Sequence, residues 1–303
     1  MEKKLFKILS LIFILIITSC EKDITVDLPK PEDKIVLEGI IENGQYPYLY
    51  VTKNIAYFDK VDTNTLINMI VIDSNAVITV THDNIIDTMH LVVDFNSFIP
   101  IKYQGNIKGE IGKTYKLKAI IKGKTYTATT TIPNPVPLDS VKFKLRFPNT
   151  ADDSTGFLWM YATDPDTIGN YYRLFSKTIG KDNVFVHPYN SVADDQYFNG
   201  QSVEYQISRG YNPATGEESD QTKEAVPRWV FLKGETVVLK FCSLDVEHYK
   251  FWYSIELQNA TDGNPFASPV TVKTNIKGGA LGVWGGYGAA FDTVYIDNSI
   301  IIN

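Results

Sequence analysis

The chain has 303 residues, of which 44% are hydrophobic, and a formal net charge of −6 at pH 7. Its length and composition predict a globular protein with two domains. The negative charge excludes attraction to nucleic acid or to anionic lipid through the overall electrostatic field.

Residues 1–19 have the features of a secretory signal peptide. Lys3, Lys4 and Lys7 give a positive start, and an uninterrupted apolar run covers residues 11–17. This run is too short for a membrane-spanning helix, which needs about 20 apolar residues. We therefore expect residues 1–19 to be removed on export.

Cys20 follows the apolar run directly. The sequence Ile17-Thr18-Ser19-Cys20 resembles a bacterial lipobox, in which the thiol is acylated by fatty acids such as palmitate and the chain is cut before the cysteine. Stable anchoring takes two or more acyl chains, which this class of N-terminus provides. The alternative is a soluble secreted protein with a cysteine near its cleavage site. With Cys20 acylated, Cys242 has no disulfide partner, and we expect it to be a buried, inert thiol.

Residues 20–34 are expected to form an acylated tether, because Pro29 and Pro31 favour extended backbone. The charged residues 21–23 resemble the signal that sends Bacteroidota lipoproteins to the outer face of the outer membrane. We therefore expect a lipid-anchored outer-membrane protein that faces the cell surface. The periplasmic leaflet is the alternative.

Residues 35–133 are predicted to form an immunoglobulin- or fibronectin-like β-sandwich without the disulfide. The runs at 35–41 and 48–53 flank Asn43-Gly44, a strong hairpin signal. A second hairpin is predicted from residues 114–121 and 125–132, because apolar residues alternate with polar ones along both runs.

Residues 137–303 are predicted to form a second β-sandwich, since prolines at 133, 135 and 137 interrupt the strand pattern. Residues 140–147 alternate like a strand with one buried face. A helix is expected near residues 244–258, where apolar residues recur at helical spacing and Ser243 or Asp245 can cap the start. The predicted fold class is all-β: two sandwiches, the second with one packed helix.

No motif indicates catalysis, a metal or a cofactor. The four histidines form no HxH or HExxH spacing, and no GxSxG motif occurs. Asp164, Asp166 and Gly169 fit the start of a calcium loop, but its later ligand positions hold Ile168 and Phe175, so we expect a turn. A metal site or a carboxylate pair assembled from distant residues stays open, and we expect no enzyme.

The glycine-rich stretch 278–288 lacks the GK[ST] ending of a phosphate loop. Its glycines fit tight turns and close backbone approach between strands. Alternatively, Trp284 and Tyr287 on a mobile loop would line a ligand or partner surface.

Several segments together resemble one family, the domain-of-unknown-function family 4249 of Bacteroidota lipoproteins. They are CEKDITVDLP (20–29), VLEGIIENGQYP (36–47), YTATTTIP (126–133), NYYRLF (170–175), YFNGQSV (197–203), HYKFWYS (248–254) and NPFASPVTVKTNIKGGALGVWGGYGA (264–289). Members are typically encoded beside TonB-dependent receptors. The resemblance implies an accessory lipoprotein partnered with such a receptor, and it brings no catalytic residues.

Three functions remain open on this basis. The leading hypothesis is a binding or accessory module of a TonB-dependent nutrient uptake system. The second is a structural or adhesive envelope lipoprotein without a small-molecule ligand. The third is a glycan or peptide hydrolase with carboxylates assembled from loops.

Overall fold

The computed structural model describes residues 32–55, 63–94, 99–148, 154–210, 229–261, 268 and 270–302. The predicted signal peptide and Cys20 lie outside the described residues, as does most of the tether. Residues Asp33–Asn303 form one compact unit. Within the described ranges, no helix is both long and apolar enough to cross a membrane.

The described residues form three sheets and two helices, which confirms the all-β fold class. The first sheet has the order β12 (Val192–Asp194), β11 (Tyr171–Thr178), β15 (Thr236–Leu244), β16 (Leu281–Tyr295), β1 (Ile35–Glu42), β2 (Tyr48–Lys53), β6 (Ile101–Gln104), β5 (His90–Val93). The second has the order β13 (Ser202–Ile207), β10 (Thr155–Thr163), β9 (Ser140–Leu145), β17 (Ile301–Ile302), and β14 (Phe231–Leu232) pairs with β10. The third has the order β4 (Ile85–Thr88), β3 (Val77–His82), β7 (Thr114–Ile121), β8 (Lys124–Thr131), and the helices are α2 (Thr63–Met69) and α3 (Val246–Thr261).

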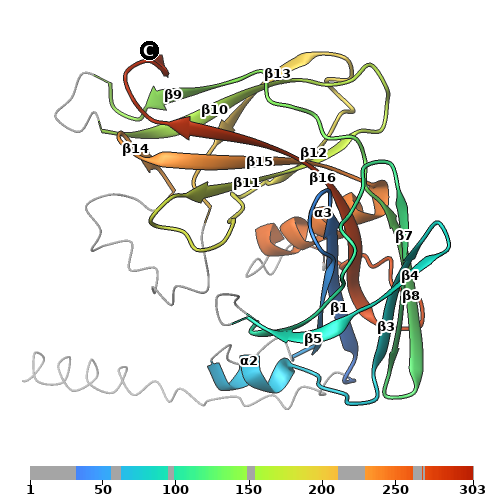
Figure 1. The fold of residues 1–303 in the computed structure, drawn as a ribbon. Coiled ribbons are helices and arrows are strands. Elements are labelled where there is room, and N and C mark those ends of the chain that lie inside the picture. Colours follow the sequence, from blue (N-terminus) through green and yellow to red (C-terminus); the bar gives the residue numbers. More distant parts are fainter. Residues whose placement is uncertain are drawn as a thin grey trace, which may run out of the picture. The chain divides into compact units, whose positions relative to one another are not determined.

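Strand β16 joins the two halves of the chain in one sheet. It pairs antiparallel with β15 and parallel with β1, from Val36 opposite Leu281 to Glu42 opposite Tyr287. In Figure 1 it is the long red strand that runs from beside β1 to beside β15. The expected boundary at residues 133–137 therefore does not separate two independent sheets, because strands from both sides of it share the eight-stranded sheet.

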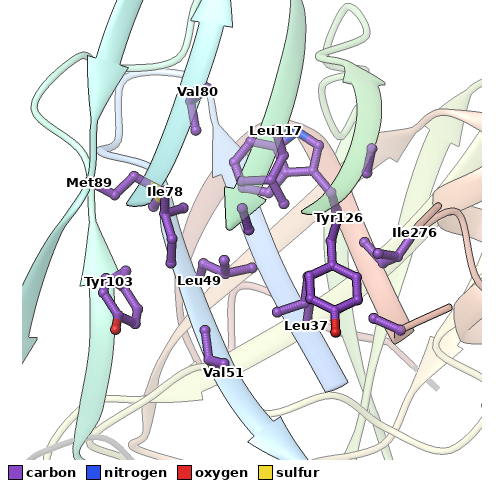
Figure 2. Packing of buried hydrophobic residues seen from close by; sticks show 14 of the residues in the cluster. Leu37, Leu49, Val51, Ile78, Val80, Met89, Tyr103, Leu117, Tyr126 and Ile276 are labelled. Atoms are coloured by element: carbon purple, nitrogen blue, oxygen red, sulfur yellow. The ribbon is translucent and has the colours of Figure 1, made fainter. Parts of the chain in front are cut away.

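The first core lies between the four-stranded sheet and one face of the eight-stranded sheet. Leu37, Leu49 and Val51 from β1 and β2 pack in one cluster with Leu117 and Tyr126 from β7 and β8 (Figure 2). The predicted alternation holds in β7, whose odd-numbered residues are buried, and the predicted β7–β8 hairpin is confirmed. The connection between these strands has positive φ at both Lys122 and Gly123, as a tight hairpin turn requires.

The second core lies between the five-stranded sheet and the other end of the eight-stranded sheet. Phe143, Leu158 and Phe231 are fully buried there and pack with Val237 and Leu239. The predicted strand at 140–147 is confirmed as β9, but it ends at Leu145, and Phe147 is exposed. Its buried face is therefore shorter than the alternation predicts.

Helix α3 confirms the expected helix, and Asp245 is its cap. Asp245 Oδ1 accepts hydrogen bonds from the backbone N–H groups of Glu247 (3.1 Å) and His248 (2.9 Å). Its second oxygen accepts one from the Thr130 hydroxyl at the end of β8. One carboxylate thus starts the helix and ties it to the first half of the chain.

Trp284→Ala should lower the free energy of unfolding by about 3–5 kcal/mol, because it leaves a cavity in the first core. The indole has no exposed surface, and its N–H donates to the Tyr115 carbonyl at 3.1 Å. Urea unfolding followed by circular dichroism measures the change. Trp229→Ala is the matched control: that indole is 40% exposed, so the expected change is below about 0.5 kcal/mol. Similar losses in the two variants would contradict the assignment of Trp284 to the core.

Candidate functional site

Trp284 and Tyr287 lie on opposite faces of one strand. The alternative of a mobile loop is wrong for residues 281–288, which form the first part of β16. Trp284 belongs to the first core, and Tyr287 is 3% exposed on the other face of the sheet. Neither side chain is part of an exposed surface, but Tyr287 lies at the edge of a group of charged and aromatic residues.

The glycines of this stretch serve close packing. A Cβ at Gly285 would lie 2.3 Å from the His248 ring of α3, and one at Gly286 would lie 2.6 Å from the Thr131 carbonyl oxygen. Real Cβ atoms do not approach so closely. The glycines therefore let α3 and the end of β8 press against opposite faces of β16.

The face of the eight-stranded sheet that carries Tyr287 holds charged and aromatic side chains from neighbouring strands. Strand registers place Glu42 beside Tyr287, Leu244 beside Tyr287, and Phe175 beside Lys240. We call the following residues the sheet-face cluster: Glu38 and Glu42 on β1, Tyr48 and Tyr50 on β2, Lys102 on β6, Arg173 and Phe175 on β11, Lys240 on β15 and Tyr287 on β16.

Arg173 is the buried end of the cluster, with 3% of its surface exposed. Its Nη1 donates to the Tyr287 hydroxyl (2.9 Å), and its guanidinium lies 3.4 Å from the centroid of the Trp252 ring on α3. Its Nε donates to Ser191 Oγ at 3.4 Å. A buried guanidinium is retained only where hydrogen bonds and aromatic faces replace water, as they do here.

Lys240 and Glu42 form an ion pair in the middle of the cluster. The Nζ–Oε2 distance is 2.9 Å, and both side chains are about nine-tenths buried. Lys240 Nζ also lies 4.7 Å from the centroid of the Phe175 ring. The pair therefore fixes β15 against β1 across β16, and both charges are already matched.

His248 and Cys242, beside the cluster, are unreactive. Trp252 Nε1 donates to His248 Nε2 (2.9 Å), so the proton lies on Nδ1, which donates to the Gly286 carbonyl (3.2 Å). Burial and the Arg173 charge lower the pKa of His248 to about 3. Burial raises the pKa of the Cys242 thiol to about 12, and the expected buried cysteine is confirmed.

Glu38 marks the open end of the cluster. Its side chain is half-buried, and loss of water around the carboxylate raises its pKa, which the Arg173 charge only partly opposes. Tyr50 lies opposite it on β2, and the Tyr48 and Tyr50 rings meet edge to face at 5.4 Å between centroids. Lys102 Nζ lies 5.6 Å from the centroid of the Tyr48 ring. Lys102 itself is paired with Asp94 at 2.8 Å. A half-buried acid beside two tyrosines can bind a partner through charge, hydrogen bonds and ring faces.

The cluster offers little for metal binding or hydrolysis. No group of three or more His, Cys, Asp or Glu side chains that could hold a metal occurs in the part of the chain that the structure describes. Glu38 and Glu42 are four residues apart on one strand, or about 13 Å, which exceeds the spacing of a glycosidase carboxylate pair. Asp164 accepts hydrogen bonds from the Tyr172 hydroxyl and from the Gly200 N–H, as expected for a structural turn.

The sequence analysis missed every member of the cluster except Tyr287. A signal for it was present, because Glu38 and Glu42 interrupt an otherwise apolar strand at positions that share one face. Arg173, set between aromatic residues in NYYRLF, was a second signal. Neither pattern alone reveals that β1 and β11 belong to the same sheet.

A comparison with protein families gives a match. A family model described as "Domain of unknown function (DUF4249)" matches residues 21–291, a range that includes the whole sheet-face cluster. No curated protein matches the chain.

Glu38→Gln should stabilise the protein at pH 7, because it removes a poorly solvated charge. Because the pKa of Glu38 is raised on folding, at pH values between the unfolded and folded pKa the folded state holds a proton that the unfolded state has already lost. Stability therefore falls as the pH rises from the unfolded value of about 4.5 through the folded pKa. The gain in the variant should disappear below that window, as measured by urea unfolding at pH 7 and pH 3.5.

Glu204→Gln is the matched control for this pH dependence. Hydrogen bonds from Lys144 and Tyr161 lower the pKa of Glu204, so this substitution should not stabilise the protein at pH 7. An equal gain in both variants, or a gain in Glu38→Gln that persists at pH 3.5, would contradict the account of Glu38.

Proposed function

We propose, from the premise that the chain belongs to the DUF4249 family, that it is an outer-membrane lipoprotein and the binding module of a TonB-dependent nutrient uptake system. The signal peptide and the lipobox-like Cys20 support the membrane anchor. The family resemblance supports the receptor as partner. The resemblance of residues 21–23 to an outer-membrane export signal supports a cell-surface location.

The observation that carries the binding role is the open end of the sheet-face cluster. Burial raises the pKa of Glu38, so its charged form is disfavoured in the isolated protein, and a partner that supplies a cation or hydrogen-bond donors would offset that cost. Tyr48 and Tyr50 flank it on rigid strands, and tyrosines are enriched where interfaces are strongest. We propose that this surface contacts the receptor.

Binding is favoured over the two alternatives for physical reasons. A purely structural spacer has no need for a half-buried acid that reduces stability. A hydrolase needs a nucleophile or two convergent carboxylates, whereas Glu42 is already paired with Lys240 and lies far along the strand from Glu38. The sheet-face cluster is therefore better suited to recognition than to catalysis.

The test is an affinity pull-down of C-terminally tagged protein from native outer membranes, read by mass spectrometry. Wild-type protein should recover a TonB-dependent receptor in stoichiometric amount. Glu38→Gln should recover at least tenfold less, although we expect it to be the more stable protein, so unfolding cannot explain the loss. Glu204→Gln, on the other sheet, should recover as much receptor as wild type.

Two results would contradict parts of this proposal. Recovery of the wild-type protein alone would remove the receptor and favour the structural alternative. Equal recovery by wild type and Glu38→Gln would keep the receptor and remove the sheet-face cluster as its contact surface.

The anchor has a separate test. Cys20→Ser should abolish labelling by a radioactive or clickable fatty acid and release the protein from the membrane fraction, because no other acylation site is expected. Cys242→Ser should remain labelled and membrane-bound. Retention of the Cys20→Ser variant in the membrane, with labelling unchanged, would contradict lipid attachment at Cys20.

A further inference from the structure

The second core contains a cavity of about 180 Å³. It lies between β10 and β13 of the five-stranded sheet and β11 and β15 of the eight-stranded sheet. Its apolar lining includes Val136, Met160, Ala162, Phe198, Val203 and Phe241. A volume of this size is several times that of a water molecule, and a wall of apolar side chains gives water few partners.

One end of the cavity is polar and internally satisfied. Asp164 and Tyr172 are each 4% exposed, and the Tyr172 hydroxyl donates to Asp164 Oδ1. The Gly200 N–H donates to the second Asp164 oxygen at 3.1 Å. With its proton committed to Asp164, the Tyr172 oxygen can still accept one hydrogen bond from a molecule in the cavity.

The charges around the cavity limit what it can hold. Its carboxyl groups are those of Asp164 and Glu204, and Glu204 is paired outside with Lys144 at 2.7 Å. An anionic guest would meet like charge without a compensating cation. Asp164 already accepts hydrogen bonds from Tyr172 and Gly200, and the apolar wall disfavours a cation, because burial removes its water. A neutral guest is the one that remains.

The cavity has an opening through which a guest can enter. Phe198, Val203 and Tyr205 belong to its lining but are only half-buried. Tyr205 is held by its hydroxyl, which donates to the Asn190 carbonyl at 2.7 Å. Aromatic and aliphatic side chains therefore form the rim. It lies where β13 of one sheet and β12 of the other are not hydrogen-bonded to each other.

We propose that this cavity is a binding site for a small neutral apolar molecule, of the size of one aromatic ring or a short branched aliphatic chain. The stacked rings of Tyr172 and Phe241, 5.0 Å apart, would form one wall against the guest. This proposal does not rest on the receptor, since Phe241 faces away from the sheet-face cluster that holds its neighbour Lys240.

The test uses methionine methyl groups as reporters. Met160 lines the cavity, whereas Met89 is buried in the first core and serves as an internal control. The mature chain with Cys20→Ser, which needs no detergent, is labelled with [methyl-¹³C]methionine and titrated with toluene. The Met160 resonance should shift saturably at millimolar toluene while that of Met89 stays in place. An unmoved Met160, or equal movement of both methyl groups, would overturn the proposal.

Two variants locate the site. Ala162→Leu places a larger side chain in the cavity and should abolish the Met160 shift without lowering the melting temperature. Ala128→Leu adds the same atoms to the filled first core, so it should lower the melting temperature and leave toluene binding intact. Val203→Phe, at the half-buried rim, should also block the shift. Toluene binding that survives both Ala162→Leu and Val203→Phe would overturn the assignment to this cavity.

Discussion

The parallel pairing of β1 with β16 is the constraint on which the rest of the described structure depends. It joins a strand near the start of the chain to one near its end and makes a single eight-stranded sheet from both halves. Asn43 reinforces the junction, because its side chain accepts from the Ala289 N–H (2.6 Å) and donates to the Ala289 carbonyl (3.3 Å). Glycines in β16 also let α3 and β8 pack closely against the two faces of this strand.

The two faces of this sheet have different roles because side chains alternate along each strand. On β1 and β16, Leu37 and Trp284 fill the first core on one face, whereas Glu38 and Tyr287 belong to the sheet-face cluster on the other. Helix α3 covers the part of this face around Arg173 and His248. Both side chains stabilise the fold, since their hydrogen-bonding groups are satisfied within the protein. Only the end around Glu38 keeps an acid whose burial is not fully compensated. That difference separates the part of the face that stabilises the fold from the part that can recognise a partner.

Local features were predictable from the sequence, and long-range pairing was not. The β7–β8 hairpin and helix α3 follow from alternation, turn residues and the Asp245 cap, all of which act within a few residues. The sequence contains no comparable signal for the β1–β16 pairing, because the alternation of apolar and polar residues in β1 would fit many other strands as partners. Two separate sandwiches were therefore expected where one sheet spans both halves. For the glycine-rich stretch, close backbone approach was predictable, but its packing partners were not. Helix α3 and strand β8, which pack against Gly285 and Gly286, come from other parts of the sequence.

The central claim is that the face of the sheet around Glu38 meets the receptor, and crosslinking in place tests it most directly. A photoreactive amino acid at position 50 would be illuminated in intact outer membranes, with the same group at the 86% exposed position 197 as control. The account predicts a covalent adduct with a TonB-dependent receptor from position 50 and none from position 197. An adduct from position 197 alone, or from neither position, would contradict it.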